Sequence, residues 1–553
     1  MKRMIALLIA LALVAGALTG CAALSRLMHA AEDRLAGKNT LPPMPLATAL
    51  PTESVYEASE YEVMDDGFVM NLSAMPAAGE EFNTEEYAAI AENGFKAVAT
   101  SPLSTFSADV DTASYCNLRR MLNNGVRPAA IPAGAVRVEE MLNYFRYDYA
   151  APADGERFAV TAEIADCPWN SGTKLLRLGV RAEELEAPAD AGSNLVFLMD
   201  VSGSMAYEDK LELAKRAMVL LLDELGENDT VSIVTYASGE EILIEGASPV
   251  SDKAALISTI DRLVASGSTY GEKGLRQAYE VAQRHFRRGG NNRVILCSDG
   301  DLNVGITSQS DLHDFVTEKK ETGVYLSVLG FGEGNYKDTK METLADDGNG
   351  NYYYIDSILE ARKVLCEELT QTLFTVADDV KFQVEFNPAK VAAYRQIGYE
   401  NRSLANEDFE DDRKDAGEMG SGACVTVLYE LMPAGDGAAE SGLRYQDTQL
   451  TEAAAGDEWL TVSIRSKAPG AQESELQTVT VGEAERTDAP SGDFRFACAV
   501  AEFGMILSGS DYAGDADYQS VLDLLKEAPL SDPYREEFFS LVKIAQRAEA
   551  LGK

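Results

Sequence analysis

Three short segments place oxygen-bearing side chains where the sequence predicts the ends of strands. The first is DVSGS, in which Asp200, Ser202 and Ser204 follow the apolar run NLVFLM. The second is the loop SGSTYGEKG, which contains Thr269, and the third is CSDGD, which contains Asp299. Carboxylate and hydroxyl oxygens are the ligands that hard cations such as Mg²⁺ prefer. These residue types predict a magnesium site if the fold brings the three segments together.

The spacing within DVSGS allows its donors to converge. Asp200 ends the predicted strand, and Gly203 permits a tight turn, so the hydroxyls of Ser202 and Ser204 can point back toward the carboxylate. A shell of hydroxyls leaves the metal electrophilic, with one coordination position open. By itself the segment also fits the capped start of a helix. The added threonine and second aspartate favour the metal site.

The elements that must position these donors alternate between strand and helix. NLVFLMD, TVSIVTYA, RVILCSD and VYLSVLGFG are apolar, strand-like runs, and the intervening segments carry apolar residues at helical spacing, such as Leu211, Ala214 and Met218. Strands that are apolar throughout must be covered on both faces. We therefore predict a doubly wound, mainly parallel α/β domain, in which ligands bind beyond the carboxyl ends of the strands.

Alternating β-like runs lie on both sides of this α/β domain, at 157–165 and 174–182 before it and at 380–388, 423–433 and 458–466 after it. We therefore predict that the domain is inserted into a β-rich sandwich, with helical segments toward both ends of the chain. The segment DTASYCNLRRMLNNG is predicted to form a helix capped by an aspartate. The predicted domains are an N-terminal region of helices and strands at 83–189, the α/β domain at 190–375 and a β-rich domain ending in helices at 376–553.

The first 21 residues, MKRMIALLIALALVAGALTGC, combine a basic start, a short apolar run and small residues before Cys21. This pattern predicts a secretory signal peptide at 1–21. LTGC resembles the lipobox of bacterial lipoproteins, which implies that Cys21 becomes an acylated N-terminus; an ordinary signal peptide is the alternative. Residues 22–82 are Pro-rich and acidic and are predicted to form a disordered tether. We therefore expect an extracytoplasmic lipoprotein anchored in a membrane of the cell envelope.

The charge balance excludes one class of partner. The 553 residues include 90 acidic and 48 basic residues, for a formal net charge of −42. Such a chain repels a phosphate backbone, so nucleic acid is excluded as a partner. Six cysteines besides Cys21 are scattered without metal-finger spacing, and whether they pair stays open. Only three histidines are available for a histidine-rich metal site or a Ser-His-Asp triad.

The set Asp200, Ser202, Ser204, Thr269 and Asp299 resembles the metal-ion-dependent adhesion site of von Willebrand factor type A (VWA) domains, with all five positions present in order. The resemblance implies a Rossmann-like fold and a bound Mg²⁺, with Mn²⁺ or Ca²⁺ as alternatives. It also implies that the serines and the threonine coordinate the ion, that the aspartates often act through water, and that an Asp or Glu of a protein partner completes the shell.

The likeness extends to the flanking segments. STFSADVDTASYCNLRRMLNNG and QIGYENRSLANEDFEDDRKDAGEMGSGACVTVLYEL are similar to the flanks found in bacterial lipoproteins that carry a VWA domain between a VWA-associated N-terminal region and a C-terminal domain of unassigned role. Asp301, Asn303 and Tyr270 would lie on the rim of the metal site and help to select the partner, although DGDLN suits a turn equally well.

The predicted function is therefore metal-dependent protein binding, in adhesion or assembly at the cell envelope, without enzymatic activity. A magnesium-dependent hydrolase of the phosphatase kind is the alternative. Against it, DVSGS lacks the second aspartate of a DxD nucleophile pair, and the chain has no Gly-x-x-x-x-Gly-Lys phosphate loop. A structural envelope protein with a purely stabilising metal is the third possibility.

Overall fold

The structure is a computed structural model. It describes residues 87, 90–108, 111–185, 192–300, 309–332, 338–368, 374–414, 416–435, 450–530 and 532–552. The predicted signal peptide, Cys21 and the tether lie outside these residues, as do Asp301 and Asn303. All described residues belong to one compact unit, Gly79–Lys553. Among the helices described, none combines the length and the apolar character needed to cross a membrane.

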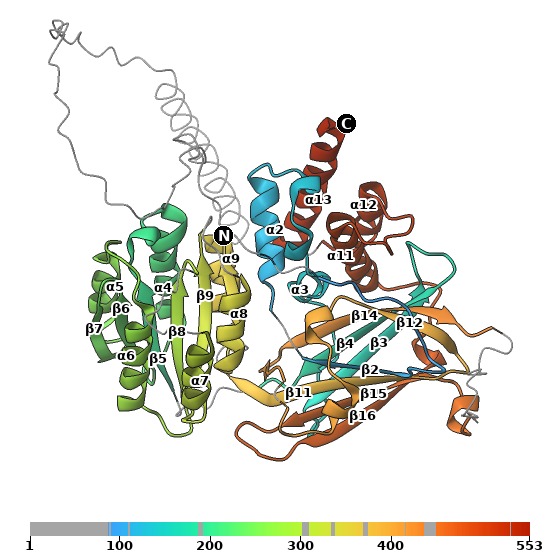
Figure 1. Ribbon diagram of the computed structural model, residues 1–553, viewed down its shortest axis with the longest axis horizontal. Coiled ribbons are helices and arrows are strands. Elements are labelled where there is room, and N and C mark those ends of the chain that lie inside the picture. The colour runs from blue at the N-terminus through green and yellow to red at the C-terminus, as the bar shows by residue number, and fades with distance from the viewer. Residues whose placement is uncertain are drawn as a thin grey trace, which may run out of the picture. The chain divides into compact units, whose positions relative to one another are not determined.

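A six-stranded sheet forms the centre of the α/β domain (Figure 1). Its order is β10-β9-β8-β5-β6-β7, with all neighbours parallel except the antiparallel edge pair of β6 and β7. The chain runs outward from β5 in one direction and from β8 in the other, so the strand order reverses between these two central strands. The strands are β5 (Ser193–Asp200), β6 (Thr230–Tyr236), β7 (Glu240–Ala247), β8 (Asn291–Ser298), β9 (Tyr325–Phe331) and β10 (Tyr352–Ile355).

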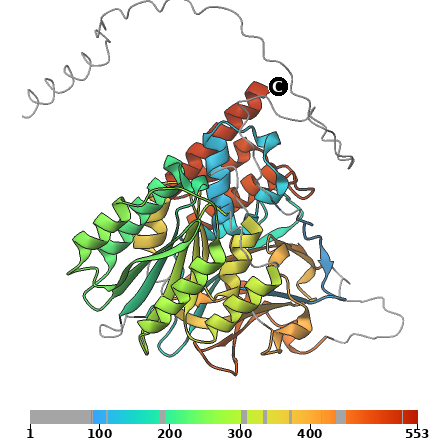
Figure 2. The ribbon, with the colours of Figure 1, turned by 60° about the vertical axis from the view of Figure 1, so that its left-hand side comes forward.

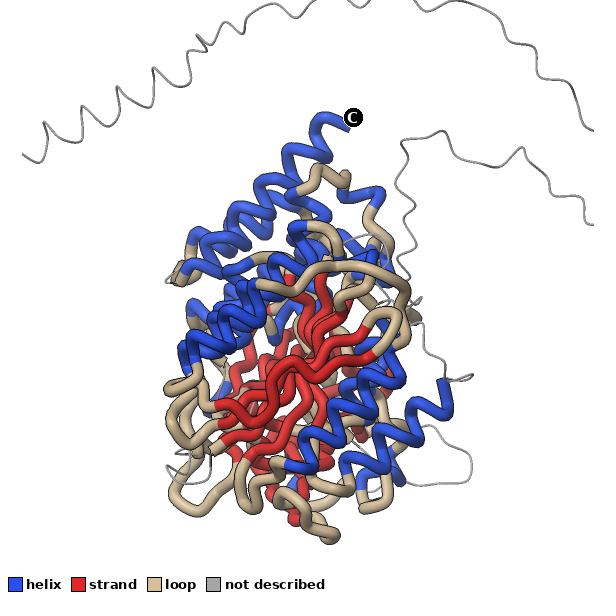
Figure 3. The backbone as a smooth tube through the Cα atoms, turned by 90° about the vertical axis from the view of Figure 1, so that its left-hand side faces the viewer, coloured by secondary structure: helices blue, strands red, loops and turns tan. Residues whose placement is uncertain are grey.

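Helices cover both faces of this sheet, as Figure 3 shows for the helices that flank the strands. Every residue of β5 and β8 is buried. Val196 of β5 belongs to the core shared with α6, α7 and α8, whereas the next residue, Phe197, belongs to the core shared with α4, α5 and α9. The predicted doubly wound fold is therefore confirmed. The helices are α4 (Leu213–Glu224), α5 (Lys253–Asp261), α6 (Gly271–Arg284), α7 (Gln309–Lys320), α8 (Asp338–Asp347) and α9 (Ile358–Arg362).

Two further sheets form the β-rich part. One has the order β1-β12-β14-β4-β3, and the other has the order β13-β11-β15-β16, with β2 also paired to β11. Leu178 of β4 lies opposite Val427 of β14, and both side chains belong to the core that also contains Val384 and Val462 of the second sheet. The strands are β1 (Lys96–Ala97), β2 (Leu103–Ser107), β3 (Phe158–Asp166), β4 (Lys174–Ala182), β11 (Thr375–Phe386), β12 (Val391–Ile397), β13 (Met419–Gly420), β14 (Cys424–Pro433), β15 (Glu458–Lys467) and β16 (Glu475–Gly482).

Strands from before and after the α/β domain therefore pair directly with each other. β4 pairs with β14, and β2 pairs with β11, with Phe106 opposite Phe382. The shared core of the two sheets makes them a sandwich, because each sheet buries its inner face against the other. The prediction that the α/β domain is inserted into a β-rich sandwich is confirmed.

A group of helices from both ends of the described chain packs together, and Figures 1 and 2 both show α2 beside α13. Its centre is aromatic: the ring of Phe145 lies 4.9 Å from that of Phe496 and 5.4 Å from that of Phe538, between centroids. Such edge-to-face pairs add to the free energy gained by burying the rings. The helices are α2 (Ala113–Asn123), α3 (Val138–Asn143), α11 (Gly492–Ser508), α12 (Tyr518–Lys526) and α13 (Pro533–Gly552).

The predicted aspartate cap of α2 is wrong. The helix begins after Thr112, whose side chain makes no capping hydrogen bond. Asp111 is buried and instead accepts a hydrogen bond from the backbone N–H of Tyr352 at 3.3 Å and forms an ion pair with Arg402 at 3.3 Å. Its partners come from distant parts of the chain, so the local pattern of an aspartate before a helix could not reveal them.

Candidate metal centre

The two predicted aspartates meet at the carboxyl ends of the central strands. Asp200 is the last residue of β5, and Asp299 directly follows β8. These strands are parallel neighbours, with Met199 opposite Cys297. Asp200 and Asp299 are 0% and 1% exposed. The fold thus concentrates two buried carboxyl groups at the point where the strand order reverses, which is where open α/β sheets bind ligands.

The two serines of DVSGS converge on the same place. The backbone N–H of Ser202 donates to Oδ1 of Asp200 at 2.8 Å, and the Oγ atoms of Ser202 and Ser204 lie 3.0 Å apart. Ser202 is buried, and Ser204 is half-buried. The turn therefore places two hydroxyls within hydrogen-bonding distance of each other, and the first of these serines contacts the carboxylate of Asp200.

The loop that carries Thr269 is fastened to this turn by backbone hydrogen bonds. Gly203 N–H donates to the carbonyl of Gly267 at 3.0 Å, and Ser266 N–H donates to the carbonyl of Val201 at 2.8 Å. Gly267 has a φ of +81°, and a Cβ atom there would lie 2.4 Å from the Ser238 hydroxyl, so the loop requires glycine. The structure thus brings the second predicted segment beside the first.

Thr269 and Tyr270 lie at the edge of this loop. Thr269 is half-buried, and Tyr270 is 50% exposed while its backbone N–H donates to the carbonyl of Ala237 at 2.9 Å. Of the three predicted rim residues, Tyr270 alone falls among the described residues, and it is exposed.

Two hydroxyls that the sequence analysis did not identify hold the second oxygen of Asp200. Tyr236 Oη donates to Oδ2 at 3.1 Å, and Ser298 Oγ donates to the same atom at 3.2 Å. Tyr236 ends β6 and Ser298 ends β8, the two strands that flank β5. Both residues end predicted strands in the sequence, and this position could have indicated that their hydroxyls lie beside Asp200. These contacts fix the orientation of the carboxyl group.

The electrostatics of the centre favour a cation. Burial raises the pKa of Asp200 to about 6; hydrogen bonds from Ser202 oppose this rise, and the nearby charge of Asp299 adds to it. A carboxyl group with a raised pKa gains more from a neighbouring cation, because the cation stabilises the ionised form that burial disfavours. A divalent ion would hold Asp200 ionised at neutral pH.

Lys210 is a further member of the centre that the sequence analysis missed. Its Nζ atom donates to Oδ2 of Asp299 at 2.9 Å, and the two side chains are 5% and 1% exposed. Lys210 lies in a π-helical turn, Glu208–Glu212, that joins DVSGS to α4. The sequence shows only a lysine at the start of an amphipathic segment, where exposure is the usual outcome.

The donor set fits a hard divalent ion. It consists of carboxylate and hydroxyl oxygens from Asp200, Ser202, Ser204 and Asp299, beside the loop of Thr269. Oxygen donors of these kinds suit Mg²⁺, Mn²⁺ and Ca²⁺. The single ammonium of Lys210 offsets only part of the charge of two carboxylates, so the centre can accept further positive charge.

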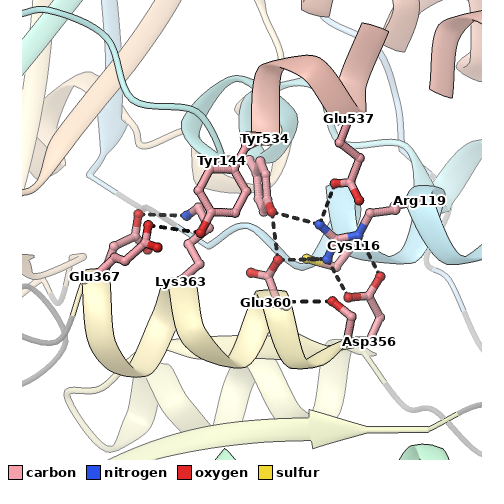
Figure 4. Close-up of polar contacts among 11 residues, drawn as sticks. Cys116, Arg119, Tyr144, Asp356, Glu360, Lys363, Glu367, Tyr534 and Glu537 are labelled. Atoms are coloured by element: carbon pink, nitrogen blue, oxygen red, sulfur yellow. Dashed lines mark hydrogen bonds and ion pairs between the residues drawn. The ribbon is translucent and has the colours of Figure 1, made fainter. Parts of the chain in front are cut away.

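A second cluster of potential ligands lies between α2 and α9. One ligand atom each of Cys116, Asp356 and Glu360 lies within 4.8 Å of the others. The guanidinium of Arg119 occupies this space: it donates to Asp356 at 2.8 Å and to Glu360 at 2.8 Å (Figure 4). Burial raises the pKa of the Cys116 thiol, which keeps it protonated and a poor ligand. The cluster is therefore an ion-pair network rather than a metal site.

Three family models match successive parts of this chain. The family model of the von Willebrand factor type A domain matches residues 194–366. A model described as von Willebrand factor matches residues 81–177, and the model for the C-terminal part of the uncharacterized protein YfbK matches residues 371–548.

The YfbK protein of Escherichia coli is 43% identical over 472 residues, which cover 84% of this chain and 81% of that protein. The uncharacterized Synechocystis protein sll0103 is 29% identical over 187 residues, which cover 34% of this chain and 43% of that protein. A solved von Willebrand factor type A structure from Catenulispora acidiphila is 16% identical, with a TM-score of 0.39, and the match covers 72% of this chain and 91% of that one.

These matches confirm the resemblance to bacterial VWA proteins, while the lipid anchor stays a prediction. The E. coli match extends over most of both chains, and the separate family models fall on the α/β domain and on the segments that flank it. The chain therefore belongs to the family of the E. coli protein YfbK and carries a von Willebrand factor type A domain.

Proposed function

We propose that this chain is a metal-dependent protein-binding module that captures an acidic side chain of a partner through a divalent cation at the carboxyl ends of β5 and β8. VWA domains generally mediate protein–protein interactions, often in a metal-dependent manner. The observation that supports the finer proposal is the convergence of Asp200, Ser202, Ser204 and Asp299 beside the Thr269 loop.

In this proposal the hydroxyls of Ser202, Ser204 and Thr269 hold the cation, and Asp200 and Asp299 balance its charge directly or through water. Mg²⁺ is the preferred ion because it keeps several waters and binds through few protein oxygens; Mn²⁺ and Ca²⁺ are the alternatives. An Asp or Glu of the partner takes the remaining position, and Tyr270, Asp301 and Asn303 form the rim that meets the partner. The exposure of the Tyr270 ring supports this role.

Binding is favoured over hydrolysis by the way Asp200 is held. Oδ1 accepts a hydrogen bond from Ser202 N–H, and Oδ2 accepts from Tyr236 and Ser298. A carboxylate nucleophile needs an oxygen free to attack the substrate. An aspartate whose two oxygens are both engaged suits charge balance better than covalent catalysis.

We also propose that the module works at the cell envelope, attached through acylated Cys21. The support for this setting is the sequence pattern of residues 1–21 alone. A partner of the module would then be another protein of the envelope or of a neighbouring cell surface.

The function can be tested by affinity capture from cell envelopes with the full chain as bait. We expect a partner to be retained in Mg²⁺ and lost in chelator, and to be lost equally with Ser202→Ala. Ser251→Ala removes an exposed hydroxyl of the same domain and serves as the matched control, since capture should be unchanged. Equal capture of the same proteins with and without chelator, and by Ser202→Ala, would show that the metal is not used.

A further inference from the structure

Lys210 brings a fixed positive charge into a centre whose other members are oxygen donors. Its ammonium group is almost fully buried, and its Nζ atom lies 2.9 Å from Oδ2 of Asp299. Burying a lysine is costly unless its charge is paired, and the pair with Asp299 provides this compensation. The lysine is therefore part of the charge balance of the centre.

Three local features accommodate this side chain. Gly332, which follows β9, has a φ of +79°, and a Cβ atom there would lie 2.2 Å from Cγ of Lys210. The ammonium lies 5.5 Å from the centroid of the Tyr207 ring, whose face attracts cations. Lys210 also sits in the π-helical turn Glu208–Glu212, and such turns are rare and frequently found at functional sites. Gly332, Tyr207 and the π-helical turn thus fix the position of the Lys210 side chain.

We propose that Lys210 is a specificity-determining residue of the metal centre: it neutralises Asp299 from within the protein, and so preserves the charge of the bound cation for the carboxylate of the partner. This inference rests on the proposed function. Asp200 and Asp299 bring two negative charges, so without Lys210 a divalent ion would be neutralised by the protein itself. Counted over Asp200, Asp299, Lys210 and the ion, the loaded centre then keeps one net positive charge, which attracts an anionic side chain.

The charge of Lys210 should lower the affinity of the centre for a divalent ion. A lysine beside the centre repels a divalent cation, and its removal leaves the full charge of Asp299 to attract the ion. The pairing of Asp299 with Lys210 should therefore weaken binding of the metal ion and strengthen binding of the partner's carboxylate by the loaded centre. If Lys210 only supported the shape of the site, its removal would weaken Mg²⁺ binding. The inference predicts the opposite, that its removal strengthens Mg²⁺ binding, so the sign of the change decides between the two.

The test is titration of the full chain with Mg²⁺ alone, by calorimetry, for the wild type and Lys210→Met. Methionine has nearly the same length and no charge. We expect Lys210→Met to bind Mg²⁺ about tenfold more tightly, since one unit charge near a divalent ion is worth at least this much at the dielectric of a protein surface. Lys215→Met is the matched control, because Lys215 is also buried but pairs with Glu212 at 2.6 Å, and its Mg²⁺ affinity should equal that of the wild type.

Thermal unfolding gives a second readout. Without metal, Lys210→Met should unfold at a lower temperature than the wild type, because a buried carboxylate has lost this cation. In Mg²⁺ its unfolding temperature should rise by more than that of the wild type. If Lys210 acted through packing alone, Lys210→Met would lower the unfolding temperature by the same amount without Mg²⁺ and with it. Lys210→Gln, which keeps a hydrogen-bond donor, provides the same comparison if the methionine variant does not fold.

In the Asp299→Asn background the ammonium of Lys210 still repels the ion, so Lys210→Met should again tighten Mg²⁺ binding. Equal Mg²⁺ affinity of Asp299→Asn with and without Lys210→Met would show that the charge of Lys210 does not act on the ion and would overturn the inference. Unchanged or weaker Mg²⁺ binding by Lys210→Met in the otherwise wild-type chain overturns the inference and leaves the proposed function standing. Failure of the wild type and both Lys210 variants to bind Mg²⁺ overturns the inference and the metal-dependent function together.

Discussion

Two clusters of carboxyl groups in this molecule are each paired with a buried basic side chain, Arg119 in one and Lys210 in the other. In the cluster between α2, α9 and α13, Arg119 donates to Asp356, Glu360 and Glu537, and also to the hydroxyl of Tyr144 at 2.8 Å (Figure 4). In the candidate metal centre, Lys210 donates to Asp299, while the hydroxyls of Ser202 and Ser204 lie close together beside Asp200.

The difference follows from the shapes of the two cations. Arginine has five donors in a rigid plane and can satisfy several carboxylates at once, whereas lysine is a compact point charge. The Arg119 cluster is therefore complete within the protein. The metal centre keeps carboxylate and hydroxyl oxygens that a further cation can use. A group of buried acidic residues is thus a candidate metal site only where the internal cation leaves some of the oxygen donors without a positive partner.

The largest effect expected from this comparison is the loss of Arg119. Arg119→Met removes the cation from the buried Asp356 and Glu360, and should lower the free energy of unfolding by about 3 to 5 kcal/mol. Chemical denaturation should show the same loss with and without Mg²⁺. Arg362→Met, at an exposed arginine of α9, should change stability by less than about 0.5 kcal/mol. Rescue of Arg119→Met by Mg²⁺ would mean that this cluster also binds metal.

The next effect concerns metal binding itself. A single-site ligand at a hundredfold excess over its Kd stabilises the folded state by about 2.7 kcal/mol. We expect Mg²⁺ to raise the stability of the wild type in this way and to leave Asp200→Ala unchanged, as measured by thermal unfolding over a Mg²⁺ series. Equal stabilisation of the two proteins would place the ion elsewhere.

Glu139 of α3 is a buried carboxyl group that differs from those of both clusters. Its Oε2 atom has no hydrogen-bond partner in the part of the chain described. Burial raises its pKa to about 8, and the charges of Glu400 and Glu140 add to the rise. Between pH 6 and 7 the unfolded chain has released this proton while the folded chain retains it, so the group should lower stability by about 1 kcal/mol as the pH rises.

Glu139→Gln removes this dependence, since glutamine does not titrate. The difference in unfolding free energy between the wild type and the variant should therefore shift by about 1 kcal/mol in favour of the variant from pH 6 to 7. Denaturation of both proteins at the two pH values isolates this group from all others that titrate. A difference that does not vary with pH would mean that Glu139 is already ionised in the folded chain.

The smallest effect on stability is expected at the rim. Tyr270→Ala removes a ring that is half exposed, and should change the free energy of unfolding by less than about 0.5 kcal/mol and leave Mg²⁺ affinity unaltered. Capture of the proposed partner should nevertheless weaken, because exposed aromatic side chains often contribute strongly to protein interfaces. Unchanged capture would remove Tyr270 from the proposed rim.

The elements and the donor types of the centre could be predicted because they depend on local patterns. Apolar strands ending in Asp200 and at Ser298, next to Asp299, are visible in the sequence, and parallel strands bring their carboxyl ends to one edge. The short edge strand β10 and the antiparallel strand β7 were not predicted, since their pairing depends on neighbouring strands rather than on their own composition.

The charge pairs could not be predicted for a related reason. Arg119 meets Asp356 and Glu537 across 237 and 418 residues of sequence. Lys210 reaches Asp299 only because a π-helical turn and the bare backbone of Gly332 make room for its stem. Such pairs arise from packing between elements that are remote along the chain, and no spacing rule connects their members.

The insertion of one domain into another also fixes an order of events during synthesis. Leu178 in β4 pairs with Val427 in β14, and Phe106 in β2 pairs with Phe382 in β11. The residues of the α/β sheet, from Ser193 to Ile355, are continuous and emerge from the ribosome before either partner strand. The α/β domain can therefore fold before β14 has been synthesised. During this interval the hairpin of β3 and β4 has an unpaired edge at β4, and such edges favour aggregation.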